Sequence, residues 1–258
     1  MVLTQLVVIL AVLVAGVAGA ALRGHDDSKD VLSVVQSAST AAAGQPSLRA
    51  TVQMHLSGNG VDVTTGGEFL VDTVHNVSSG SMQAPGIGEL KFVAANGLSY
   101  SQLRRPDAAG HHWVSVPSPN GASSLGGQDP LAMLKLIGDA KGVETVGDES
   151  VHHVTTTHYR EKLDPARLGE AVVKTGQFTL PPGFADSVKD AVIDLWIDDR
   201  NLPRRMTMSL GVQQITMSMK LEFLDYGKPV HVTVPSADDV TAVANMQELI
   251  EKLRSGLH

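Results

Sequence analysis

The stretch from residue 206 to residue 223 alternates strictly between apolar and polar side chains. This pattern restricts the possible fold more tightly than any other feature of the sequence. The apolar positions are Met206, Met208, Leu210, Ile215, Met217, Met219, Leu221 and Phe223. A period of two residues is that of a β-strand with one dry face and one wet face. A slip of one residue would exchange the two faces, so the pattern predicts an antiparallel hairpin of fixed register.

Similar alternation recurs through most of the chain. We expect strands at residues 51–56, 61–71, 74–82, 89–95, 98–103, 112–116, 143–146, 151–159, 192–198, 204–210, 214–224 and 230–234. Hairpin turns are expected at Asn96-Gly97 and at Gly147-Asp148-Glu149. Short connections between consecutive strands favour an antiparallel sheet over a parallel one.

Helical patterns separate or flank these strands at a few places. They are expected at residues 30–43, at residues 129–137, at residues 164–174, in a short segment ending near Asp190, and at residues 236–254. Ser236 with Asp239 resembles a capping box at the start of the last helix. Many antiparallel strands with a few inserted helices predict an α+β fold.

The amino-terminal residues predict export. Residues 2–22 contain no charged side chain, and 21 helical residues span about 30 Å, the thickness of a hydrocarbon core. Ala18-Gly19-Ala20 also resembles a signal-peptidase site. We therefore expect residues 1–22 to be a cleaved signal peptide or a retained anchor in the cytoplasmic membrane. A linker at residues 23–29 and a single domain at residues 30–258 would follow.

Composition excludes several classes of function. The chain has 20 Lys and Arg against 27 Asp and Glu, a formal charge of −7, so it lacks the basic excess that nucleic-acid binding requires. It has no cysteine, which excludes disulfides, thiolate catalysis and cysteine-ligated zinc. No Gly-x-Ser-x-Gly elbow or glycine-rich phosphate loop is present.

Histidine offers little support for a metal site. His111-His112 and His152-His153 are doublets, and adjacent residues of a strand point to opposite faces, so neither doublet can chelate one ion. We therefore expect no metal, no cofactor and no enzymatic activity. A hydrolase that uses His158 with a nearby carboxylate is the alternative that these residues leave open.

The dry face of the 206–223 hairpin is the candidate site. Four of the nine methionines lie on it, and methionine is flexible and polarizable enough to pack against ligands of variable shape, such as acyl chains. The eight apolar residues of this face are therefore predicted to line a lipid cavity. The alternative interpretation is that they form ordinary core beneath the helices.

Several short motifs resemble a known family. They lie at residues 142–147 (Gly-Val-Glu-Thr-Val-Gly), 156–159 (Thr-Thr-His-Tyr), 195–198 (Leu-Trp-Ile-Asp), 202–205 (Leu-Pro-Arg-Arg) and 225–230 (Asp-Tyr-Gly-Lys-Pro-Val). In this order they resemble the actinobacterial envelope lipoproteins of the LppX/LprG type, which are similar in fold to the LolA carriers. The resemblance implies a strongly curved antiparallel half-barrel with helices on its concave face. It also implies a lipid or glycolipid carrier outside the cytoplasmic membrane, with an envelope transport partner.

One departure from that family concerns the lipid anchor. Residues 13–16 (Leu-Val-Ala-Gly) are followed by Val17, and residues 17–19 by Ala20, where the family carries a lipidated cysteine. Diacylglyceryl attachment is therefore excluded.

A second function is compatible with the same fold. An envelope scaffold or sensor with a filled core would bind a protein partner instead of a lipid. Its candidate surface is the polar face of the hairpin, with Thr216, Ser218, Lys220 and Glu222.

Overall fold

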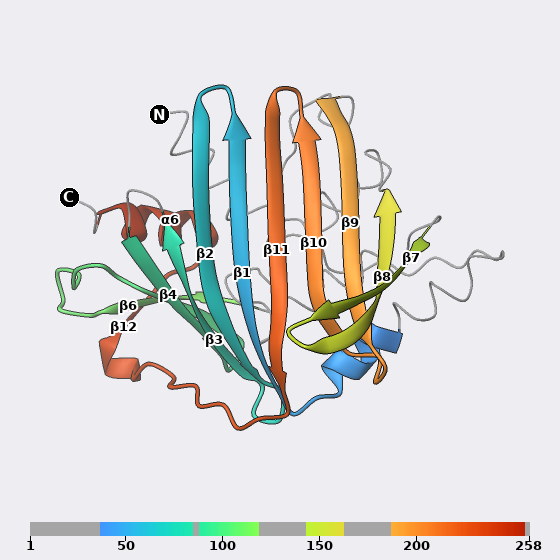
Figure 1. The fold of residues 1–258 in the computed structure, drawn as a ribbon. Helices are drawn as coiled ribbons and strands as arrows, with labels where there is room; N and C mark the ends of the chain where they lie inside the picture. Colours follow the sequence, from blue (N-terminus) through green and yellow to red (C-terminus); the bar gives the residue numbers. More distant parts are fainter. Residues whose placement is uncertain (1–36, 85–87, 119–142, 163–186, 256–258) are drawn as a thin grey trace.

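The computed structural model describes residues 37–84, 88–118, 143–162 and 187–255 (Figure 1). Its strands are β1 (Ser47–Gly58), β2 (Val61–Asp72), β3 (Val77–Ala84), β4 (Gly88–Ala95), β5 (Leu98–Gln102), β6 (Trp113–Pro117), β7 (Glu144–Val151), β8 (Val154–Lys162), β9 (Val188–Asp198), β10 (Pro203–Val212), β11 (Ile215–Tyr226) and β12 (Val240–Ala242). They form one twelve-stranded sheet in the order β12-β6-β5-β4-β3-β2-β1-β11-β10-β9-β8-β7.

Strand β1 joins the two halves of this sheet. Strands β1 to β6 and β7 to β11 are each antiparallel meanders, and β1 pairs with β11 to connect them. Met54 thereby faces Met219, far along the chain. The short β12 pairs in parallel with β6, and every other pairing is antiparallel.

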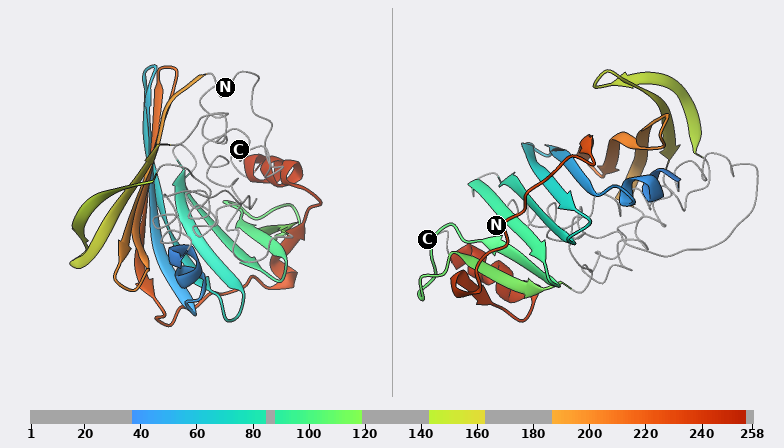
Figure 2. Two further views of the ribbon diagram at one scale, coloured as in Figure 1. Left: turned by 90° about the vertical axis from the view of Figure 1, so that its right-hand side faces the viewer. Right: turned by 90° about the horizontal axis from the view of Figure 1, so that it is seen from below.

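The sheet is strongly curved, and most of the core lies on its inner side (Figure 2). Ala38 and Ala42 of a helix at residues 37–43 pack against this side, which we call the concave face. The opposite side, the convex face, carries the bent β7–β8 hairpin. The predicted α+β class with a curved antiparallel sheet is confirmed.

The hairpin predicted from alternation forms with the predicted register. Strands β10 and β11 meet at a turn where Gln213 has a positive φ of 55°. Met208 pairs with Met219 and Leu210 with Met217, so their side chains share one face.

The main errors in the strand predictions lie at three places. The β7–β8 turn lies at His152-His153 instead of at residues 147–149, because both histidines adopt positive φ while Gly147 lies at a bulge inside β7. Strand β9 begins at Val188, where a helix was expected to continue to Asp190. Residues 230–234 form no strand, although Val232 and Val234 pack against the core between Pro229 and Pro235, two residues that lack an N–H.

The carboxy-terminal helix is shorter than predicted. Residues 237–239 form a single 3-10 turn, and Val240–Ala242 then pairs with β6 as β12 before helix α6 (Met246–Ser255). Ser236 makes no capping hydrogen bond; instead Asn245 Oδ1 accepts from the Glu248 N–H at 3.0 Å. Val240 and Thr241 are β-branched, and their pairing with β6 is favoured over the helix that the spacing of apolar residues predicted.

The remaining helix predictions at residues 129–137 and 164–174 lie outside the described residues, as do residues 1–36. Among the helices that the structure describes, none is long and apolar enough to cross a membrane.

Candidate functional site

The concave face is a continuous apolar surface made of rows of side chains, and each row consists of residues paired across neighbouring strands. In one row, Met208 on β10 lies between Ile193 on β9 and Met219 on β11. Met219 in turn lies beside Met54 on β1. The four side chains are at least 92% buried. Because paired residues of neighbouring strands project to the same side, this row forms a band across four strands.

Neighbouring rows extend this apolar surface in both directions. Met206 lies between Leu195 and Leu221, while Leu210 lies between Ala191 and Met217. All eight residues predicted for the lipid cavity lie on this face, seven of them buried and Ile215 half-buried at its edge. Their contact with a lipid stays a prediction.

The sequence interpretation missed two methionines of this face. Met54 on β1 and Met82 on β3 belong to the same core cluster, so six of the nine methionines lie on the concave face. Alternation in the first strand was visible, with Val52, Met54 and Leu56 on one side. The pairing of β1 with β11, which joins them to the hairpin, has no signal in a single sequence.

Polar groups lie at both ends of the row that runs from Ile193 on β9 to Met54 on β1. Glu161 on β8 pairs with Ile193 and is 97% buried on the concave side. Thr65 on β2 pairs with Met54, and its hydroxyl donates to the Gln83 carbonyl oxygen. The apolar band is therefore bounded by a carboxylate at one end and by a satisfied hydroxyl at the other.

The convex face carries a polar network centred on His158. Its Nδ1 lies 2.9 Å from Glu149 Oε1, and its Nε2 lies 2.7 Å from Asp194 Oδ1. Trp196 stacks on the imidazole and donates its indole N–H to Glu149 Oε2 at 2.9 Å. This hydrogen bond, followed by that of His158, holds the pKa of Glu149 below its usual range. Arg160 Nε also donates to Asp194, at 2.7 Å.

Both ring nitrogens of His158 are engaged by carboxylates, and the side chain is 5% exposed. A general base needs one nitrogen within reach of a nucleophile or water, and here neither nitrogen is available while Trp196 covers the ring. The predicted carboxylate near His158 is present, but this geometry does not support the hydrolase alternative.

The end of the β7–β8 hairpin reaches across the convex face to β11. Figure 1 shows β7 crossing in front of the neighbouring strands, and His152 Nε2 lies 3.2 Å from Glu222 Oε1. Arg205 donates to the same oxygen at 2.7 and 3.0 Å. Burial alone would raise the pKa of Glu222, but the Arg205 hydrogen bonds and nearby Lys220 hold it below its usual range.

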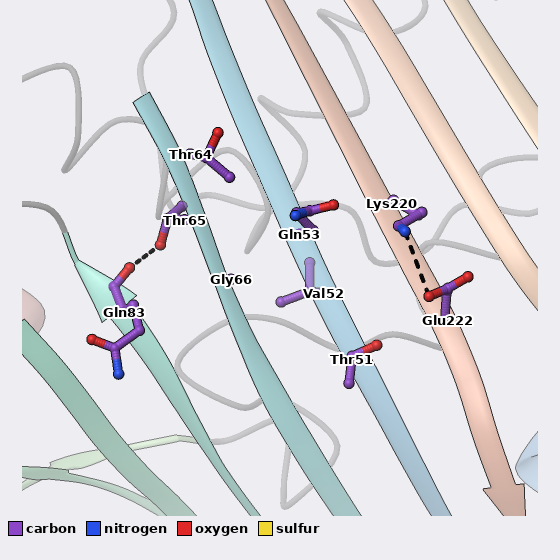
Figure 3. Close-up of a pocket in the computed structure, with 9 residues that line it drawn as sticks. All are labelled: Thr51, Val52, Gln53, Thr64, Thr65, Gly66, Gln83, Lys220 and Glu222. Atoms are coloured by element: carbon purple, nitrogen blue, oxygen red, sulfur yellow. Dashed lines mark hydrogen bonds and ion pairs between the residues drawn. The ribbon is translucent and has the colours of Figure 1, made fainter. Parts of the chain in front are cut away.

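A shallow depression of about 360 Å³ lies beside this contact on the convex face (Figure 3). It extends over strands β11, β1, β2 and β3 and is lined by Thr51, Val52, Gln53, Thr64, Thr65, Gly66, Gln83, Lys220 and Glu222. The polar hairpin face proposed as a partner surface therefore contributes Lys220 and Glu222 to this depression.

Within the described ranges, no group of three or more His, Asp or Glu side chains is placed to hold a metal ion. His112 Nδ1 instead contacts Asp239 Oδ1 at 2.7 Å, and His111 Nδ1 contacts Thr241 Oγ1 at 2.8 Å. These histidines fasten the loop before β6 to η1 (Ala237–Asp239) and β12.

Comparison with solved structures identifies the architecture. The structure is similar to lipoprotein LppX of Mycobacterium tuberculosis, with 16% identity, a TM-score of 0.52, and coverage of 81% of this chain and 100% of that one. LprF of Mycobacterium bovis gives the same identity and TM-score, with coverage of 81% and 99%. No protein-family model and no curated sequence matches this chain. At this identity the likeness establishes the fold alone, and it confirms the LppX-type architecture that the motifs predicted.

Proposed function

We propose that this chain, which has the fold of the LppX and LprF lipoproteins, is a non-enzymatic lipid carrier outside the cytoplasmic membrane. In this proposal the acyl chains of a lipid or glycolipid lie against the concave face. Residues 1–22 would direct export and, where uncleaved, hold the protein at the membrane. An envelope transport partner would load or empty the site.

The observation that carries this proposal is the composition of the concave face. Six methionines lie there beside Val, Leu, Ile and Phe side chains from both halves of the sheet. Unbranched methionine side chains change rotamer easily, so this surface can adapt to chains of different length and branching. The polar convex face of the same strands provides the contrast that an acyl-chain site requires.

The test is mass spectrometry of organic extracts from the full-length protein purified from its native host. We expect a defined set of acyl lipids to co-purify, in amounts comparable to the protein. A variant with a charge introduced on the concave face should lose them, whereas a matched variant on the convex face should keep them.

The opposite result would identify the alternative function. A folded protein that carries no lipid from its host, and that takes up none from vesicles of host lipids, would contradict the carrier. The envelope scaffold with a filled core would then be the better interpretation, and its partner would be sought on the convex face.

A further inference from the structure

The convex depression has a neutral polar centre between charged borders. Gln53 on β1 lies between Lys220 on β11 and Gly66 on β2. Farther along the same face, His55 contacts Asp62 at one end, and Arg49 contacts Glu68 at the other. Figure 3 shows that the residues lining the depression come from four neighbouring strands.

Glycine at the centre of the depression lets the backbones of β1 and β2 approach closely. A Cβ atom at Gly66 would lie 2.9 Å from the Val52 carbonyl oxygen, closer than real Cβ contacts allow. Any larger residue would therefore displace the β1 backbone. The absence of a side chain at Gly66 leaves a notch in the lining, beside the carboxamide of Gln53.

The lining side chains keep hydrogen-bonding capacity. Among the described residues, the side chains of Thr51, Gln53, Thr64 and Gln83 form no hydrogen bond within the chain. Two hydroxyls and two carboxamides offer both donors and acceptors around one notch. This mixture matches the hydroxyl groups of a sugar, which also donate and accept.

The charges of the depression favour a neutral ligand. The charged side chains that line the depression are Lys220 and Glu222, and Lys220 Nζ lies 3.6 Å from Glu222 Oε2. The lining therefore carries one positive and one negative charge, with no net charge to select an anion or a cation. A volume of about 360 Å³ is within the range of roughly 300–1,000 Å³ found for small-molecule sites.

We propose that this convex depression binds a neutral saccharide. The site is separate from the concave face and goes beyond lipid carriage, because Gln53, Lys220 and Glu222 project from the other side of the same strands. The sugar is either a free saccharide or the headgroup of a glycolipid in a membrane.

The experiment records amide chemical shifts of the isotopically labelled full-length protein. Maltose and cellobiose are the free probes, and phosphatidylcholine vesicles with and without monogalactosyldiacylglycerol present the headgroup. The variant Gln53→Leu with Gln83→Leu removes both carboxamides. Gln214→Leu, an exposed residue of the β10–β11 turn, is the matched control, and circular dichroism checks that each variant is folded.

We expect shifts at Thr51, Gln53, Gly66 and Gln83, with affinity about tenfold weaker in the double variant and unchanged in the control. A response to the disaccharides indicates a free saccharide, and a response confined to the galactolipid vesicles indicates a headgroup. Both results support the site. The absence of a response to every probe, or binding that the double variant retains in full, would overturn it without affecting the concave lipid proposal.

Discussion

His158 lies flat against Trp196, with ring centroids 4.2 Å apart and an angle of 15° between the ring planes. The two residues face each other from paired strands, β8 and β9. Glu149 bridges them, since it contacts the imidazole and accepts from the indole N–H. The stack thus fixes the β7–β8 hairpin to the convex face.

Replacement of His158 by Ala should strongly destabilise the fold. The change leaves the Asp194 carboxylate, whose side chain is 13% exposed, without its imidazole partner and opens a void beside Trp196. We expect a loss of roughly 2–3 kcal/mol in the free energy of unfolding, measured by urea denaturation followed by tryptophan fluorescence. His231→Ala, at an exposed position, should change it by less than about 0.5 kcal/mol. Equal effects of the two variants would show that the network contributes nothing.

The turn of the same hairpin stores backbone strain that a glycine can relieve. His153 has a φ of 65°, a region that costs an L-residue roughly 1–2 kcal/mol. His153→Gly should therefore raise the free energy of unfolding by roughly 0.5–1 kcal/mol, after allowance for the greater freedom of glycine in the unfolded chain. His153→Ala keeps the Cβ atom and should give no gain. If the glycine variant is no more stable than the alanine variant in urea, the turn is not strained.

The sequence predicted the parts of the fold that local patterns determine. Alternation around Met208 and Met219 gave both the hairpin and its register, since one face of each strand is buried. The β7–β8 turn was misplaced because Gly147 is a common turn residue and His152-His153 is not. The helix expected from residue 236 was wrong because Val240 pairs with β6, a contact that the local pattern does not contain.

The candidate site, like the fold, was predicted only where local patterns determine it. The apolar residues of the 206–223 hairpin were found from their period alone. Glu161 and Met54 join the concave face through the order of the strands, which no motif encodes. A carboxylate near His158 was expected, but the sequence could not identify it as Asp194, because that residue lies 36 positions away and meets His158 only once β8 and β9 pair.

Asp107 should make stability depend on pH under acidic conditions. The Thr241 hydroxyl and then the His111 N–H lower the pKa of Asp107 from 3.8 to about 2. Because the folded protein favours the ionised form, this stabilisation is present above pH 3.8 and is lost as the pH falls towards 2. Asp107→Asn should be less stable than the parent at neutral pH.

The difference between Asp107→Asn and the parent should shrink across this acidic window. Urea unfolding at a series of pH values measures that difference directly, because other carboxylates titrate equally in both proteins. Asp62→Asn, at a side chain that is 82% exposed, is the control and should give a small difference at every pH. A constant gap for Asp107→Asn would mean that its charge does not stabilise the contact between the loop and β12.

Met217→Glu separates a lipid cavity from an ordinary core. Met217 is buried on the concave face between Leu210 and Leu56. A carboxylate placed among acyl chains either stays ionised without a partner or takes up a proton, and either course costs several kcal/mol. The variant should therefore retain no lipid. If the face lines a cavity, water reaches the new carboxylate in the empty protein, and the melting temperature should fall only modestly.

The matched control is Ser218→Glu, which introduces the same side chain on the convex side of the same strand. It should keep both its lipid and its melting temperature, measured by mass spectrometry of extracts and by thermal unfolding. An unfolded Met217→Glu variant would mean that the methionine face is close-packed core, because close packing admits no water to the buried charge. A folded Met217→Glu variant with a normal lipid content would place the lipid elsewhere on the molecule.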